Sequence, residues 1–161
     1  MKKRLIIKCG ISITICLLIG FLTTAATETP GNDWYANLEK PFFHPPTSLI
    51  APIWIILYIM IGIAAGIVWN RGFYHKWVKI ALYHFAFQLI LNGFWPLLFF
   101  GLHQQLLALL EIILLFIVVL YTIKYFKVVS NTAAYLLYPY AIWILYAAVL
   151  NFEIWRLNLS N

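Results

Sequence analysis

Five apolar segments of about twenty residues each divide this sequence, and they constrain its fold more than any other feature. They cover residues 5–26, 48–69, 77–100, 104–126 and 133–155. A helix of about 20 apolar residues crosses the hydrocarbon core of a bilayer. The segments lack the alternation of membrane β-strands, and a helix satisfies its own backbone groups in lipid. The sequence therefore predicts an all-α membrane protein: one domain over residues 1–161, a bundle of five transmembrane helices.

Composition supports this class and excludes others. Of the 161 residues, 64% are hydrophobic and only 10% are charged, whereas soluble domains are about half apolar and a quarter charged. An ordinary soluble enzyme, a disordered chain and a disulfide-rich secreted domain are all excluded. A long Pro-rich loop, residues 27–47, is expected between the first two helices, with Pro30, Pro41, Pro45 and Pro46.

The distribution of positive charge predicts the orientation of the chain. Nine of the eleven Lys and Arg residues fall on one side of the expected bundle, at positions 2, 3, 4, 8, 71, 76, 79, 124 and 127. Lys40 and Arg156 fall on the other side. Because cytoplasmic loops carry the excess of Lys and Arg, the N-terminus is predicted to be cytoplasmic. The net charge of +6 is thus an orientation signal and not evidence for nucleic acid.

The first segment resembles a signal peptide, with a basic start and Thr24-Ala25-Ala26 at its end. Its 18 uncharged residues from Cys9 onward exceed the usual apolar region of about 7–15 residues, so we expect a retained helix. Cys9 and Cys16 lie about 10 Å apart along such a helix, too far for a disulfide. The four histidines lack metal-ligand spacing, and no metal site is expected.

Polar side chains share one face of the third segment. His84, Gln88, Asn92 and Trp95 are spaced by four, four and three residues. Such a face avoids lipid, so it either bonds neighbouring helices or lines a ligand pocket. Glu111 in the fourth segment is either a functional carboxylate or a structural one that is neutral or bonded to a neighbouring helix.

Two other segments carry matching aromatic faces. Tyr140, Trp143, Ala147 and Asn151 share a face of the last segment, while Trp54 and Tyr58 lie one turn apart in the second. Three helices thus each contribute aromatic and small or amide side chains. The pattern indicates an aromatic-lined pocket for a flat hydrophobic ligand.

Four motifs in order resemble the TspO/MBR family, which comprises translocator proteins, peripheral-type benzodiazepine receptors and tryptophan-rich sensory proteins. They read WYANLEKPFFHPP at 34–46, PIWIILY at 52–58, QLILNGFWP at 88–96 and LLYPYAIW at 136–143. The likeness extends over residues 33–158. It implies a five-helix fold, often dimeric, in a membrane that the compact chain and basic N-terminus suggest is bacterial.

The resemblance also implies a function. Family members bind porphyrins, such as protoporphyrin IX and haem, as well as sterols and benzodiazepine-type ligands, with no cofactor required. The expected activity is sensing or regulation of tetrapyrrole levels. Alternatives are a light-dependent porphyrin-degrading enzyme, a transporter of porphyrin or sterol, and a structural scaffold. The expected partners are the tetrapyrrole, the bilayer and a second copy of the chain.

Carried over by position, Trp54 and Trp143 would contact porphyrin and, if degradation occurs, act as catalytic residues. Tyr35, Asn92, Trp95 and Ala147 also match pocket positions, and residues 34–46 would form the lid. The predicted ligand-binding set is Tyr35, Pro45, Trp54, Tyr58, Gln88, Asn92, Trp95, Tyr140, Trp143 and Ala147.

Two positions depart from the family pattern. Phe42 and Phe43 replace a Ser-Trp pair, so the lid keeps an aromatic ring but loses an indole N–H. Phe152 replaces the tyrosine of a proposed cholesterol motif, which argues against sterol binding.

Overall fold

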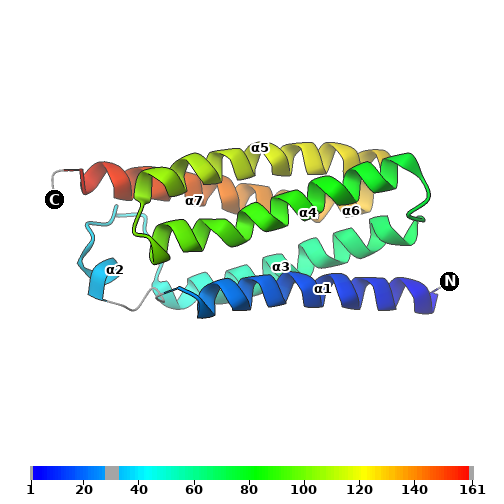
Figure 1. The fold of residues 1–161 in the computed structure, drawn as a ribbon, viewed down its shortest axis with the longest axis horizontal. Helices are drawn as coiled ribbons and strands as arrows, with labels where there is room; N and C mark the ends of the chain where they lie inside the picture. Colours follow the sequence, from blue (N-terminus) through cyan, green and yellow to red (C-terminus); the bar gives the residue numbers. More distant parts are fainter. Residues whose placement is uncertain (1, 28–32, 160–161) are drawn as a thin grey trace.

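The computed structural model describes residues 2–27 and 33–159, an elongated bundle of helices (Figure 1). Among these residues every regular element is a helix. The elements are α1 (Lys2–Ala25), α2 (Asp33–Asn37), α3 (Thr47–Asn70), α4 (Lys76–Pro96), the π-helix η1 (Leu97–Gly101), α5 (Gln105–Val129), α6 (Asn131–Tyr135) and α7 (Tyr138–Leu157). Five helical stretches in the described part are long and apolar enough to cross a membrane. The predicted all-α, five-helix membrane protein is confirmed.

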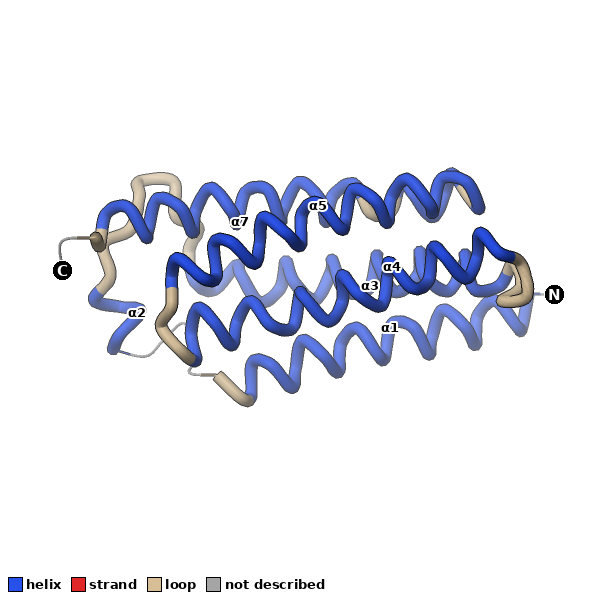
Figure 2. Tube along the Cα trace, turned by 45° about the horizontal axis from the view of Figure 1, so that its top comes forward, coloured by secondary structure: helices blue, strands red, loops and turns tan. Residues whose placement is uncertain are grey.

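The spanning helices form two groups along one axis. Helices α1 and α3 pack as an antiparallel pair, while α4 and α7 both pack on α5 (Figure 1). Figure 2 shows the same helices side by side, with the main connections at the two ends of the bundle. The two groups touch less extensively than the members of each, and this leaves room for a cavity between them.

Two glycines bring α1 unusually close to α3. A Cβ atom at Gly62 would collide with the backbone of Ile13, and one at Gly66 with the backbone of Cys9. Small residues spaced by four allow such close approach of helices in lipid. This pair therefore packs helices within one chain.

Prolines modify two of the predicted helices. The expected helix over residues 133–155 is divided into α6 and α7 by a turn at Leu136 and Leu137, because Pro139 has no N–H to donate. After Pro96 the third span continues as the π-helix η1. The predicted Pro-rich loop contains the short helix α2, and its Pro30 lies outside the described residues.

The two ends of the bundle differ in charge. The N-terminus, the α3–α4 turn and the α5–α6 junction share one end, while α2 and the C-terminus lie at the other (Figure 1). The nine Lys and Arg residues counted above belong to the N-terminal end, here called the basic end. The opposite end is called the lid end. That the basic end faces the cytoplasm stays a prediction.

Candidate ligand-binding site

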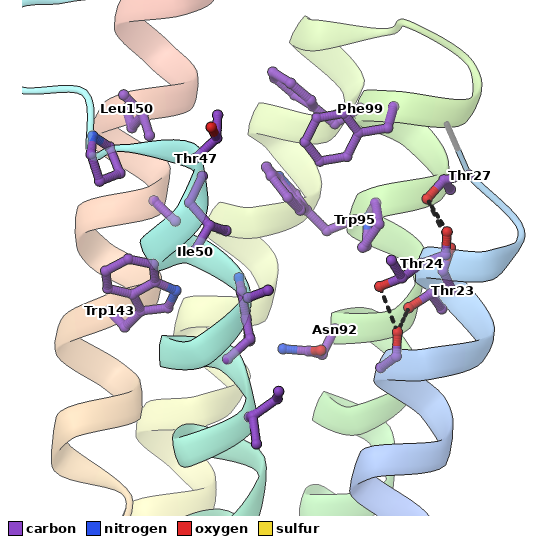
Figure 3. Close-up of a pocket in the computed structure, with 18 of the residues that line it drawn as sticks. Thr23, Thr24, Thr27, Thr47, Ile50, Asn92, Trp95, Phe99, Trp143 and Leu150 are labelled. Atoms are coloured by element: carbon purple, nitrogen blue, oxygen red, sulfur yellow. Dashed lines mark hydrogen bonds between the residues drawn. The ribbon is translucent and has the colours of Figure 1, made fainter. Parts of the chain in front are cut away.

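A cavity of about 890 Å³ lies at the lid end, between the α1–α3 pair and the other helices. Figure 3 shows its walls converging from α1, α3, α4 and α7. The volume falls within the ~300–1,000 Å³ of small-molecule sites. Eight of the ten predicted ligand-binding residues line it: Tyr35, Pro45, Trp54, Tyr58, Asn92, Trp95, Trp143 and Ala147.

The wall made by α3 and α7 is aromatic. The rings of Trp54 and Trp143 meet edge to face with centroids 6.4 Å apart. Tyr58 flanks Trp54 at 5.5 Å, and Tyr146 flanks Trp143 at 5.3 Å. The buried Nε1 of Trp143 has no hydrogen-bond partner in the described residues. This wall therefore combines stacking surfaces with one unused donor.

The opposite wall, on α4 and η1, has its polar groups paired. Trp95 donates its Nε1–H to Oδ1 of Asn151 at 3.1 Å, and Asn151 Nδ2 donates to the Gln105 carbonyl at 3.0 Å. Trp95 also stacks on Phe99 at 5.1 Å. These contacts fix the indole of Trp95 before any ligand arrives.

A buried hydrogen-bond chain forms the floor. Tyr58 donates to Asn92 Oδ1, Asn92 Nδ2 donates to the Tyr140 hydroxyl at 2.8 Å, and Tyr140 donates to Gln88 Oε1 at 2.7 Å. Gln88 and Tyr140 are thus beneath the cavity and do not line it. The polar face of the third span serves both expected purposes, because Asn92 lines the cavity while it bonds α3 and α7.

Two other candidates lie away from the cavity. His84 bonds the Ile80 carbonyl at 2.9 Å and packs on Tyr125 of α5, with ring centroids 4.5 Å apart. Glu111 of α5 is not among the lining residues, and its carboxylate oxygens are buried without a partner in the described part of the chain.

Residues 34–46, the lid, are fastened at two points, one on α7 and one on the residue that caps its C-terminal end. The Tyr146 hydroxyl donates to the Phe43 carbonyl at 2.8 Å. Asn158 accepts from the Glu39 N–H and donates to the Glu39 carbonyl, both at 3.0 Å. Phe43 contributes this carbonyl, while the Phe42 side chain is fully exposed at 102%. The lid thus keeps an attachment at the position where the family pattern has tryptophan.

Inside the lid, Tyr35 and His44 form a hydrogen bond of 2.7 Å. Burial, with a smaller contribution from Tyr146, raises the pKa of Tyr35 to about 12, so its phenol stays protonated. Burial and the neighbouring Lys40 ammonium lower the pKa of His44. At neutral pH, Nε2 of a neutral His44 therefore accepts a hydrogen bond from the protonated Tyr35 hydroxyl.

Sequence reasoning missed the contribution of α1. Thr23, Thr24 and Thr27 line the cavity, and each hydroxyl bonds a carbonyl of its own helix, for example Thr24 to Gly20 at 2.8 Å (Figure 3). Their hydroxyl hydrogens are therefore already used in bonds to backbone carbonyls of α1. Tyr146 was also missed, although it follows Trp143 by three residues and so shares its face.

Comparison with known proteins identifies the family. The sequence profile described as TspO/MBR family matches residues 12–156. The chain belongs to the TspO/MBR family. Three relatives illustrate the range of TspO/MBR proteins that it resembles, from an archaeon, an animal and a bacterium.

The tryptophan-rich protein TspO of Archaeoglobus fulgidus is 46% identical, over 95% of this chain and 98% of its own. The human translocator protein is 39% identical, over 86% of this chain and 82% of its own. The tryptophan-rich sensory protein of Cereibacter sphaeroides is 35% identical, over 84% and 83%. TspO/MBR membership and the five spanning helices make this chain a multi-pass integral membrane protein.

Proposed function

We propose that this TspO/MBR protein binds a tetrapyrrole, such as protoporphyrin IX or haem, in the lid-end cavity and acts as a sensor or regulator of its level. The observation that carries the proposal is the aromatic wall of Trp54 and Trp143 facing a cavity of about 890 Å³. The name of the Cereibacter sphaeroides relative, a sensory protein, agrees with this role.

The chemistry of a porphyrin matches the walls. Its flat apolar ring offers faces to indole rings, which favour offset or edge-to-face contacts. Its carboxylates need donors, and Thr47 and Ser48 line the cavity at the N-terminus of α3. Helix N-termini attract anions through their unpaired N–H groups. The Trp143 N–H supplies a further donor.

The test is a titration of purified protein with protoporphyrin IX, followed by tryptophan fluorescence. Ala147→Phe inserts a ring into the cavity beside Trp143 and should abolish saturable quenching. Val149→Phe adds a ring to the same helix on its lipid-facing side and should leave quenching unchanged. Absence of saturable quenching in the wild type, or equal behaviour of both variants, would contradict the proposal.

The same rings favour a second candidate, light-dependent oxidation of the bound porphyrin by dioxygen. Tyr58, Trp54, Trp143 and Tyr146 form a row of neighbouring oxidisable rings, with centroid separations of 5.3 to 6.4 Å. Illumination of the aerobic complex should then bleach the porphyrin absorption faster than illumination of free porphyrin. Two results would contradict degradation and support binding alone. One is an equal bleaching rate for bound and free porphyrin, and the other is an unchanged bleaching rate in Trp143→Phe at full porphyrin occupancy.

A further inference from the structure

A second hollow lies toward the basic end of the bundle, opposite the lid-end cavity. It has a volume of about 410 Å³ and lies between α1, α3 and α4. Its lining is apolar apart from one serine, and consists of Ser12, Ile15, Ala65, Trp69, Phe73, Leu82, Phe85, Ala86 and Leu89. We call it the basic-end groove.

The groove opens on the lipid-facing surface. Helices α1 and α4 meet at Gly93, where a Cβ atom would touch Ile19 and Thr23, and the groove separates them closer to the basic end. Two of its lining side chains are well exposed, Ile15 at 47% and Phe73 at 44%. From Leu82 to Leu89 it follows α4 for about 10 Å, along the bundle axis. A narrow apolar slot of this direction suits one acyl chain of a bilayer lipid.

Two lysines stand at the outer end of the groove. Lys8 Nζ donates to the Trp69 carbonyl at 3.2 Å and lies 5.4 Å from the centre of the Trp69 ring. Lys79 Nζ lies 5.9 Å from the centre of the Phe73 ring. Both rings belong to residues that line the groove.

No carboxylate of the sequence is close to these lysines along the chain. The five acidic residues occupy positions 28, 33, 39, 111 and 153, outside residues 2–15, 65–86 and 118–135, which build the basic end. Nine Lys and Arg residues belong to the same end. The outer end of the groove therefore has positive charge to offer to an anion from outside the chain.

We propose that the basic-end groove binds an anionic phospholipid, with one acyl chain in the groove and the phosphate of its headgroup against Lys8 and Lys79. The groove accommodates the acyl chain and the lysine pair attracts the negative charge. A zwitterionic lipid brings a phosphate but no net negative charge, because its own ammonium group balances the phosphate. A free phosphate ion brings no acyl chain. This site is distinct from the tetrapyrrole cavity and does not depend on the function proposed for it.

Brominated lipids provide the test, because bromine on an acyl chain quenches a tryptophan that it touches. Full-length protein is placed in vesicles that contain brominated phosphatidylglycerol or brominated phosphatidylcholine. The signal of Trp69 is obtained by subtracting that of the Trp69→Phe variant. We expect Trp69 to be quenched at several-fold lower mole fractions of the anionic lipid, since each lysine near a headgroup strengthens binding about fivefold.

Two variants separate the lysine pair from general surface charge. Lys8→Gln with Lys79→Gln should lower the preference at least fivefold, because it removes both headgroup contacts. Lys124→Gln with Lys127→Gln makes the same charge change at the same end, on α5, and should preserve the preference. If both double variants lowered the preference for the anionic lipid equally, the preference would come from nonspecific surface charge, and the proposal would be overturned.

The acyl chain is tested with Ala86→Leu, which fills the groove from an exposed position. Quenching of Trp69 by both lipids should fall, with circular dichroism unchanged. Added glycerol phosphate should not compete with the lipid. Unchanged quenching in this variant would overturn the proposal. The proposal would also be overturned if no lipid quenched Trp69 until the protein was diluted to monomers. That result would mean that a second copy of the chain, and not a lipid, occupies the groove.

Discussion

Two tryptophans on facing walls of the lid-end cavity differ in how the protein uses their N–H groups. Trp95 donates to Asn151, which is itself anchored on the Gln105 carbonyl, whereas Trp143 has no hydrogen-bond partner in the described residues. A buried polar group without a partner costs free energy, so natural proteins rarely keep one without a reason. One wall is therefore fixed by the fold, and the other is available to a ligand.

The largest expected effect comes from breaking the hydrogen-bond chain at the floor of the cavity, which joins α4 to α3 and α7. Asn92→Leu leaves the buried hydroxyls of Tyr58 and Tyr140 without their shared amide. We expect the free energy of unfolding to fall by about 1–3 kcal/mol. Unfolding by denaturing detergent, followed by circular dichroism, measures this. Tyr58→Phe removes only one hydroxyl and should cost less. An equally stable Asn92→Leu protein would contradict a fixing role for the network.

Trp143→Phe should separate binding from stability. It keeps an aromatic ring but removes the N–H, so we expect the Kd for protoporphyrin IX to rise about tenfold with little change in unfolding, because no protein group loses a partner. Fluorescence titration and detergent unfolding give the two values. Trp95→Phe is the matched control, and it should lower stability by about 1 kcal/mol because Asn151 loses a donor. If the two variants changed the Kd and the unfolding free energy equally, the proposed difference between the two walls would be wrong.

Attachment of the lid to the α7 wall should control how fast a ligand leaves. Tyr146→Phe retains the ring beside Trp143 but removes the hydrogen bond to the Phe43 carbonyl. We expect porphyrin dissociation to accelerate about fivefold, since a single neutral hydrogen bond contributes about 1 kcal/mol. Stopped-flow release into excess apomyoglobin measures the rate. Tyr138→Phe on the same helix, outside the cavity lining, should leave the rate unchanged.

The smallest effect should come from pH. Because the pKa of His44 is lowered from 6.5 in the closed lid, closure favours the neutral ring and binds fewer protons than the open lid. Closure is therefore fully stable above about pH 6.5 and weakens as the pH falls below that value. Porphyrin release should be about twofold faster at pH 5.5 than at pH 7.5. His44→Gln should remove this dependence. His103→Gln, which alters the ring stacked on Trp34, should retain it.

Helix positions and most cavity residues could be predicted from sequence, because both depend on periodicity. The apolar segments predicted the spans to within a few residues, and the shared faces of Trp54, Asn92 and Trp143 brought these side chains to one cavity. The same periodicity placed Gln88 and Tyr140 with them. It could not show that these two side chains lie below the cavity surface, because helical periodicity gives the face of a residue and not how far below the cavity it is buried once the helices pack.

Other features had no local signal. The pairing of Asn158 with Glu39 joins residues far apart in the chain. The cavity wall on α1 depends on how closely α1 approaches α3 at Gly62 and Gly66. The division of α6 from α7 had a signal in Pro139, but its consequence is a turn two residues before the proline.

The distribution of the cavity walls along the chain sets the order in which the site is built during synthesis. Helices α1 and α3 are adjacent spans and leave the ribosome first, so the glycine-packed hairpin can assemble early with Trp54 facing lipid. Trp143 and both anchors of the lid, Tyr146 and Asn158, arrive with the last helix. A chain that stops before α7 has half a cavity and an unattached lid. The cavity is therefore complete only in the finished chain, and the proposed porphyrin binding would report that insertion of all five spans is complete.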